Sequence, residues 1–116
     1  MIRVAVYKNA KRIVGFDVSG HAGYGEAGSD IICSAISAII YTALGYMDEK
    51  MRQGDGRQLR FEEKDGHIRW HRDTTIGSLF EKETDAVLEA MVIGCRQIEA
   101  SYGTNYVKVQ CEEVHS

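Results

Sequence analysis

The stretch that decides the fold runs from Asp30 to Met51 and reads D-I-I-C-S-A-I-S-A-I-I-Y-T-A-L-G-Y-M-D-E-K-M. Its apolar residues recur at intervals of three and four, which is the spacing of a helix with one buried face. Gly54 and Gly56 follow and are expected to stop this helix. We therefore expect a long central helix. Its apolar stripe consists of Ile32, Ile36, Ile39, Ile40, Ala43, Leu44, Met47 and Met51.

Segments on both sides of this helix alternate between apolar and polar residues, as strands with one buried face do. Before the helix, residues 2–7 and 14–18 alternate in this way and are separated by a short turn, which predicts a hairpin. After the helix, Asp65 and Gly66 stand between two shorter runs, and an Asp-Gly step in that place is typical of a hairpin turn. A last strand is expected over residues 106–111.

A second helix is expected to begin at Ser78 and to end at Gly103. Ser78 with Glu81 three residues later forms a capping box, and Gly103 is suited to a left-handed cap. The predicted order is β-β-α-β-β-α-β, an α+β two-layer sandwich with both helices on one face of a largely antiparallel or mixed five-stranded sheet. The apolar stripe of this helix comprises Phe80, Val87, Leu88, Met91, Cys95, Ile98 and Tyr102.

The opposite face of the predicted sheet is expected to carry aromatic side chains. Tyr7, Trp70 and Tyr106 are placed on or near it by the alternation of their strands. A homodimer that covers this face would explain exposed aromatic residues. We therefore expect two copies of the chain to associate.

Composition limits the classes of protein and partner. The 116 residues are 44% hydrophobic and contain no proline, which fits a single domain over residues 1–116. The 14 basic and 17 acidic residues give a net charge of −3, so the chain lacks the basic surplus that direct binding of nucleic acid requires. No apolar run approaches the roughly 20 residues of a membrane span, and no signal peptide is apparent. We expect a soluble, cytoplasmic protein with no membrane partner.

The three cysteines are not spaced as a C-x-x-C pair, which argues against a disulfide framework and a structural zinc site. Cys95 and Cys111 lie on the apolar stripes of their own elements and are expected in the core. His67 and His71 share one strand face without a cysteine or carboxylate pattern to complete a zinc site, so they are expected at the surface. We expect neither a metal nor a cofactor.

Cys33 is the cysteine that this pattern leaves unexplained. It is expected in the first turn of the central helix, because Ser29 or Asp30 can be the N-cap. Unpaired N–H groups and the helix dipole there favour a thiolate. His21 lies where the second strand ends, so the following loop permits its imidazole to return to that helix end. Such a pair suits nucleophilic attack on a carbonyl, with backbone amides at the helix start, including that of Cys33, as candidate oxyanion donors.

A purely structural interpretation is also open. In it, Cys33 is a small core residue and His21 a loop residue that is hydrogen-bonded to backbone. Against this, Cys33 shares its helical face with Asp30 and Ser37, which makes a polar edge. Asp30 either caps the helix, hydrogen-bonds the loop or orients His21. Ser37 either bonds back to the carbonyl one turn earlier or donates toward the sulfur.

The loop before the central helix spells G-x-G-x-x-G at Gly23, Gly25 and Gly28, a pattern typical of dinucleotide binding. That motif needs a second parallel strand with an acidic residue about 20 positions later, whereas Asp48 still lies within the predicted helix. The glycines, together with Gly20, are better explained by a mobile loop that opens for a peptide and closes over it. A small nucleotide-binding domain remains an alternative.

The run from Gly20 to Ser37 resembles the signature of the Prp family of ribosomal-processing cysteine proteases, the YsxB-like domains. That family has Gly-His at a strand end, a glycine-bearing loop, then Gly-x-Asp-Ile-[Val/Ile]-Cys and a serine one helical turn later. Chain length and element order also resemble the family across essentially the whole chain. The matching residues are Gly20, His21, Gly28, Asp30, Ile31, Ile32, Cys33 and Ser37.

The resemblance implies roles for these residues. Cys33 would be the nucleophile and His21 its base, and the supporting positions would be Gly20, Asp30 and Ser37. Family members are typically homodimers with the glycine loop lying over the site. That loop would bind the cleavage motif through Gly23, Tyr24, Gly25 and Gly28, with Tyr24 a candidate to stack on aromatic residues.

The resemblance also implies a substrate. Members of this family remove a short N-terminal extension from ribosomal large-subunit protein L twenty-seven, cutting after a hydrophobic, aromatic-rich motif. The precursor of that protein is therefore the expected partner, and the mild acidity of this chain suits a basic ribosomal protein. The alternative function is a non-catalytic ribosome-associated or assembly module that keeps the thiol for binding.

Overall fold

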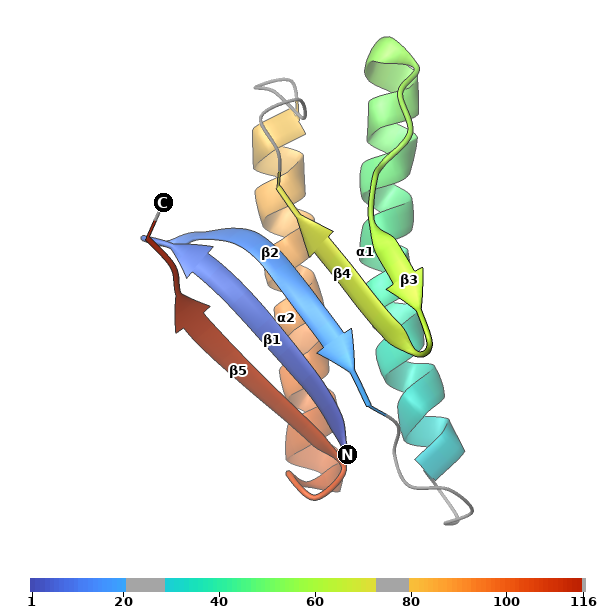
Figure 1. The fold of residues 1–116 in the computed structure, drawn as a ribbon, viewed down its shortest axis with the longest axis vertical. Helices are drawn as coiled ribbons and strands as arrows, with labels where there is room; N and C mark the ends of the chain where they lie inside the picture. Colours follow the sequence, from blue (N-terminus) through green and yellow to red (C-terminus); the bar gives the residue numbers. More distant parts are fainter. Residues whose placement is uncertain (21–28, 73–79, 116) are drawn as a thin grey trace.

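Seven elements form two layers in the computed structural model, which describes residues 1–20, 29–72 and 80–115. Both helices lie on one face of the sheet and run in opposite directions (Figure 1). The element order is the one predicted from the sequence. The elements are β1 (Ile2–Asn9), β2 (Arg12–Ser19), α1 (Ser29–Asp55), β3 (Glu62–Lys64), β4 (His67–His71), α2 (Glu81–Tyr102) and β5 (Val107–Glu113).

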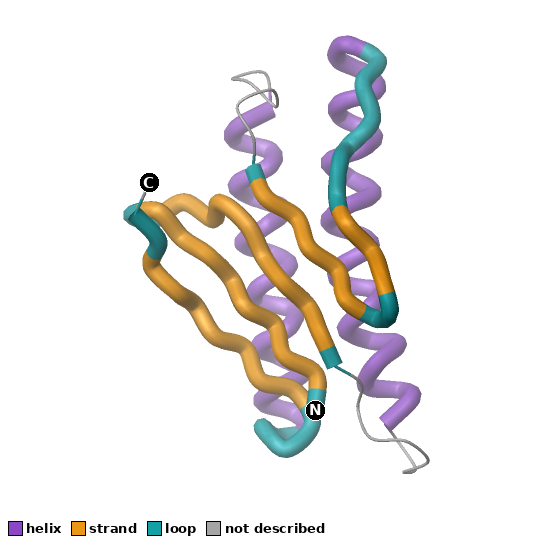
Figure 2. Tube along the Cα trace, viewed as in Figure 1, coloured by secondary structure: helices purple, strands orange, loops and turns teal. Residues whose placement is uncertain are grey.

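The sheet is five-stranded and mixed, with the strand order β3-β4-β2-β1-β5 (Figure 2). Neighbouring strands are antiparallel except β1 and β5, which are parallel. Val4 of β1 stands opposite Val18 of β2 on one side and Val109 of β5 on the other. This register confirms the predicted α+β fold and places the end of β2 beside the start of the chain.

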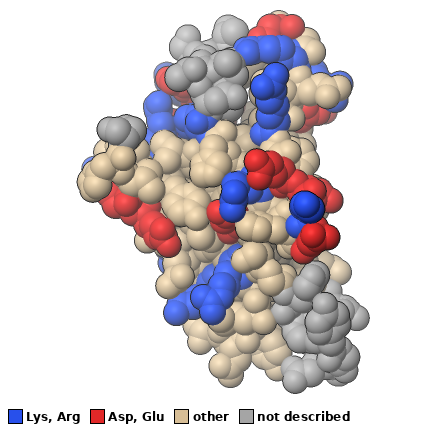
Figure 3. Space-filling model, in the orientation of Figure 1, with Lys and Arg blue, Asp and Glu red and all other residues tan. Residues whose placement is uncertain are grey.

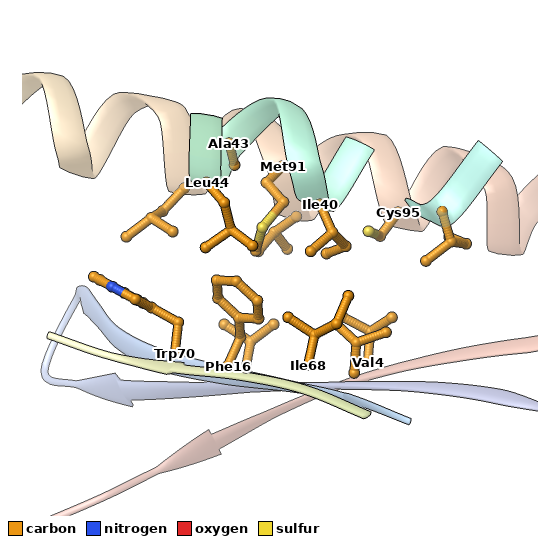
Figure 4. Packing of buried hydrophobic residues seen from close by; sticks show 14 of the residues in the cluster. Val4, Phe16, Ile40, Ala43, Leu44, Ile68, Trp70, Met91 and Cys95 are labelled. Atoms are coloured by element: carbon orange, nitrogen blue, oxygen red, sulfur yellow. The ribbon is translucent and has the colours of Figure 1, made fainter. Parts of the chain in front are cut away.

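The core lies between the sheet and the two helices, as Figure 4 shows. Every second residue of β1 faces the helices, and the α1 stripe meets it from above because its period of three and four keeps one face toward the sheet. Ile40 and Leu88 of the two helices are 0% exposed, as is Phe16 of β2. The predicted stripe of α1 is confirmed, with Ile39 only partly buried.

Trp70 contradicts the expectation that it lies on the opposite sheet face. It is 1% exposed, and its ring lies 5.8 Å from that of Phe16 in the core. The cause is the register: Trp70 is paired directly with Phe16, and residues directly opposite in an antiparallel pair point to the same face. Tyr106 packs against the core as well. Of the three aromatic residues, Tyr7 stands on the open face, where it stacks on His71.

The open face of the sheet carries a polar cluster centred on Asp17 instead of an aromatic patch. Its carboxylate accepts hydrogen bonds from Tyr7 Oη at 3.1 Å and Arg69 Nε at 3.1 Å, and it also contacts His67 Nε2. Acidic and basic side chains lie next to one another near the middle of this face in Figure 3. Burial raises the pKa of Asp17, but hydrogen bonds from His67, Arg69 and Tyr7 outweigh it, so that its pKa is lowered. The cluster ties β4 to β2.

We predict that Asp17→Asn lowers the free energy of unfolding at pH 7 by about 1–3 kcal/mol, because it leaves charged hydrogen bonds weakened. The pKa of Asp17 is lower in the folded chain than its ordinary value of 3.8, so its contribution is complete above that pH. The difference between the two proteins should therefore shrink as the pH falls below 3.8 in urea titrations. Asp65→Asn, in an exposed turn, is the matched control. A difference that stays constant down to low pH would contradict this account.

Cys95 and Cys111 differ although both were expected in the core. Cys95 is 0% exposed, which confirms the expectation, and burial raises the pKa of its thiol to about 12. Cys111 is exposed, and Arg96 Nη2 donates to its sulfur at 3.2 Å. The reason is that β5 diverges from α2 along its length (Figure 1), so only the first apolar residues of the strand, Val107 and Val109, reach the core.

The ends of α2 differ from the prediction. Phe80 holds the N-cap position without a side-chain hydrogen bond, and the expected cap, Ser78, lies outside the described residues. The Phe80 ring packs against Gly54 of α1, where a Cβ would lie 2.5 Å from it. Gly103 ends the helix with a φ of 101°, and its N–H donates to the Glu99 carbonyl at 2.8 Å. Its ψ of 158° is extended, so the cap is not the left-handed one expected.

The hairpin of β3 and β4 is short. β3 begins at Glu62, because Leu59 is drawn into the core and its N–H donates to Asp48 Oδ1 of α1 at 2.9 Å. The turn itself is confirmed, since Asp65 and Gly66 have φ values of 53° and 77°, both positive as this two-residue turn requires. The hairpin therefore stands at the sheet edge beside α1.

The length and composition of α1 correct one expectation. An 18-residue segment between Ile31 and Asp55 has a mean hydropathy of 1.5, so α1 is long and apolar enough to span a membrane by length and composition alone. The sequence prediction that no run approaches such a span was wrong. The apolar stripe of α1 nevertheless packs on the sheet, and the core helix of a soluble protein meets the same criterion.

Candidate active site

A cleft of about 230 Å³ lies between the N-terminal half of α1, the adjoining ends of β1 and β2, and the β3–β4 hairpin. Core side chains of three strands and α1 reach its apolar part: Ile2, Val18, Ile36 and Ile68. Its remaining lining comes from Gly20, Cys33, Ser37, Tyr41, Glu63, Lys64, Asp65 and Gly66. An apolar interior with polar groups around it is the common form of a ligand or substrate site.

The helix α1 places Cys33 on this cleft. Cys33, Ser37 and Tyr41 are four residues apart in turn, so they form one row along the helix, and all three line the cleft. Cys33 is partly buried and packs at the edge of the core. Its surroundings differ from those of Cys95, which has the full burial that a purely structural thiol would show.

The start of α1 corrects the expected position of Cys33 in the helix. The helix begins at Ser29, so Ser29 and Asp30 both belong to it and neither is the N-cap. Cys33 is its fifth residue, and in a regular helix its N–H donates to the carbonyl of Ser29. The amide of Cys33 is therefore not an oxyanion donor.

Gly20 directly follows β2 and lies against Met1 at the start of the chain. Its φ is +88°, and a Cβ on it would overlap the carbonyl oxygen of Met1. A residue with a side chain would meet both obstacles, since L residues rarely adopt a positive φ. Gly20 thus ends β2 against the start of the chain and lines the cleft. These two constraints explain why a glycine follows β2 at this point.

Several expected site residues lie outside the described residues: His21, Gly23, Tyr24, Gly25 and Gly28. The described chain leaves β2 at Gly20 and resumes at Ser29. The structure therefore brings together Gly20, Cys33 and Ser37 of the predicted set. Asp30 lies in the first turn of α1.

Tyr41 and the hairpin residues of the cleft were missed by sequence reasoning. A signal for Tyr41 was present, because it continues the row of Cys33 and Ser37 by one more helical turn. The hairpin had no such signal, since Glu63 reaches the cleft only through the pairing of β4 with β2. Within residues 1–20, 29–72 and 80–115, no group of three histidine, cysteine or acidic residues is arranged to hold a metal ion.

The family model described as cysteine protease Prp matches residues 1–108. The chain belongs to the Prp cysteine protease family. The Prp ribosomal processing cysteine protease of Bacillus subtilis is 23% identical over 95 residues, covering 82% of this chain and 83% of that protein. Its Staphylococcus aureus counterpart is 24% identical over 110 residues, covering 90% and 94%. The resemblance of the sequence to the Prp family is thereby confirmed.

Solved structures show the same fold. The Staphylococcus aureus Prp in complex with a substrate peptide superposes with a TM-score of 0.76 at 20% identity, covering 97% of this chain and all of that one (100%). A Streptococcus mutans protein, SMU.848, gives a TM-score of 0.76 at 21% identity, covering 98% and 96%. The Prp fold therefore extends over nearly the whole chain.

We predict that Gly20→Ala destabilises this Prp domain more than Gly56→Ala does. Both glycines have positive φ, but nothing lies within 4 Å of a Cβ at Gly56. Gly56→Ala should lose about 1–2 kcal/mol from backbone strain. Gly20→Ala should lose about 1–3 kcal/mol more, because the methyl group displaces Met1. Denaturant unfolding measures both, and equal losses would show that the contact with Met1 is unimportant.

Proposed function

We propose that this chain is a cysteine endopeptidase in which Cys33 is the nucleophile and His21 its base. The observation that carries the proposal is the place of Cys33: a partly buried thiol that lines a cleft, in a chain of a cysteine protease family. Gly20 and Ser37 line the same cleft, and we assign them, with Asp30, supporting roles.

The reaction follows from these groups. The imidazole of His21 takes the thiol proton, and the Cys33 thiolate attacks the scissile carbonyl carbon. Backbone amides in the first turn of α1 stabilise the oxyanion. The C–N bond breaks as the imidazolium donates its proton to the leaving amine, which leaves a thioester on Cys33. Water then hydrolyses the thioester and restores the thiol.

The substrate that we propose is the N-terminal extension of ribosomal large-subunit protein L twenty-seven. The relatives of this chain are ribosomal processing proteases. The structure of the Staphylococcus aureus protein has been solved with a substrate peptide and with a covalently linked product peptide. The apolar part of the cleft suits a hydrophobic cleavage motif. The residues of the preceding loop, Gly23, Tyr24, Gly25 and Gly28, are proposed to bind that motif. Such a function places the protein in the cytoplasm.

We predict that the unmodified protein shortens the L twenty-seven precursor from the same organism at its N-terminus, detected by intact-mass analysis. Cys33→Ala and His21→Ala should lower the rate by at least about 10³-fold, because loss of a member of a catalytic pair abolishes the shared step. Cys111→Ala is the matched control, since its thiol is exposed on another element.

Cleavage by Cys33→Ala at the unmodified rate would refute the assignment of the nucleophile. Absence of cleavage by the folded, unmodified protein would refute the substrate. If that protein and Cys33→Ala then bind the precursor equally well, a non-catalytic binding module becomes the better interpretation.

We further propose that the protein acts as a homodimer, as the family resemblance implies. The open sheet face no longer supports this by its aromatic residues, because Trp70 lies in the core and Asp17 organises a polar cluster there. One chain has a mass of 13.0 kDa, so light scattering should give about twice that value under the conditions of the cleavage assay. A mass of one chain with full activity would contradict the proposal.

A further inference from the structure

Tyr41 and Glu63 join α1 to the β3–β4 hairpin at the cleft. Tyr41 Oη donates a hydrogen bond to Glu63 Oε2, and both residues line the cleft together with Cys33. Tyr41 is 41% exposed, so its ring remains accessible from the cleft side. The pair is therefore part of the surface that a peptide in the cleft meets.

The hairpin depends on such a contact because the sheet holds it on one side only. β3 has three residues, all exposed, and pairs with β4 alone at the edge of the sheet. On the open face, Arg69 of β4 is bound to Asp17. On the helix side, Tyr41 binds the middle residue of β3, Glu63. This hydrogen bond joins β3, at the edge of the sheet, to α1.

The distance from Cys33 to this pair corresponds to a definite position in a substrate. Tyr41 follows Cys33 by eight residues, which is about 12 Å along a helix. An extended peptide covers that length with three or four residues. A peptide that lies along α1 with its scissile carbonyl at Cys33 therefore reaches the pair with its third or fourth residue.

The pair offers hydrogen-bond acceptors to such a residue. The single hydroxyl proton of Tyr41 is directed to Glu63, and that hydrogen bond, followed by burial, raises the pKa of Tyr41 to about 12. The phenol thus stays protonated at neutral pH. The free electron pairs of its oxygen and of the Glu63 carboxylate can accept hydrogen bonds from a substrate. Among the described residues that line the cleft, Lys64 and Asp65 carry opposite charges, so Glu63 leaves a net negative charge.

We infer that Tyr41 and Glu63 form a specificity-determining subsite of this protease, three or four residues from the scissile bond, that accepts a hydrogen-bond donor and rejects a carboxylate. The inference rests on the proposed cleavage at Cys33 and extends it, because it assigns a substrate preference to residues outside the proposed catalytic pair. The preference acts on binding, so it should appear in KM with kcat little changed.

The test uses peptides that span the cleavage site of the precursor. In matched pairs, glutamine or glutamate replaces the residue three or four positions from the scissile bond, on each side in turn. At the position that reaches the subsite, the unmodified protein should show a KM about three- to tenfold higher for the glutamate peptide. Glu63→Gln keeps an acceptor but loses the charge, so it should reduce this ratio to less than about twofold.

Two further variants separate substrate contact from stability. Tyr41→Phe should raise KM for the long peptide and leave KM unchanged for a peptide with two residues on each side of the bond. Tyr46→Phe, another exposed tyrosine of α1, should change neither value. Because each ratio compares two peptides on one protein, a lower folded fraction does not alter it.

The outcomes distinguish this inference from the proposed function. If the unmodified protein cleaves none of the peptides or the precursor, the proposed function is wrong. If it cleaves them and Glu63→Gln discriminates between glutamate and glutamine as strongly as the unmodified protein, the subsite is refuted. Equal effects of Tyr41→Phe on long and short peptides would also refute it.

Discussion

The packing of α1 against the sheet is the constraint on which the rest of the structure depends. One side of the helix fills the core with the stripe that includes Ile32, Ile36 and Ile40. Because a helix is a rigid cylinder with 3.6 residues per turn, burial of that stripe fixes where every other residue of α1 points. The row of Cys33, Ser37 and Tyr41 is thereby aimed along one edge of the core, where the cleft lies. Hydrophobic burial therefore also aligns the proposed nucleophile.

The cleft exists because strands that end at different levels meet beside the N-terminal half of α1. β4 pairs with β2 as far as Val18, while β2 continues to Ser19 and the chain to Gly20. The hairpin turn at Asp65 and Gly66 ends at this level and lines the cleft with its neighbours. Apolar core residues such as Ile68 are consequently accessible at this end of the molecule. A substrate site results without a separate domain.

Local patterns in the sequence predicted the elements well, because periods of two and of about 3.6 are set by the geometry of each element alone. They placed the α1 stripe and the Asp65–Gly66 turn correctly. They failed for Trp70 and Cys111, whose burial depends on which strand pairs with which and on how far a helix extends over the sheet. No local period contains that information.

Some residues of the candidate site could likewise be predicted from a local pattern, and others could not. Cys33 and Ser37 could be found from a short motif, since one helix carries both. The part of the site on the hairpin could not be found, because Glu63 reaches Tyr41 from a different element through the tertiary fold. The exact start of α1 also escaped prediction: Ser29 and Asp30 are both typical caps, yet both lie inside the helix.

The close approach of Gly20 to Met1 has a practical consequence for work with this protein. Ile2 lines the cleft and the Met1 carbonyl faces Gly20, so residues joined before Met1 by a purification tag would emerge beside the candidate active site. The other terminus is remote from it: Val114 N–H donates to the Lys8 carbonyl at 2.8 Å, at the far end of β1, and the two ends of the chain are well separated in Figure 1. A tag at the C-terminus is therefore attached far from the cleft, whereas an uncleaved N-terminal tag begins beside it.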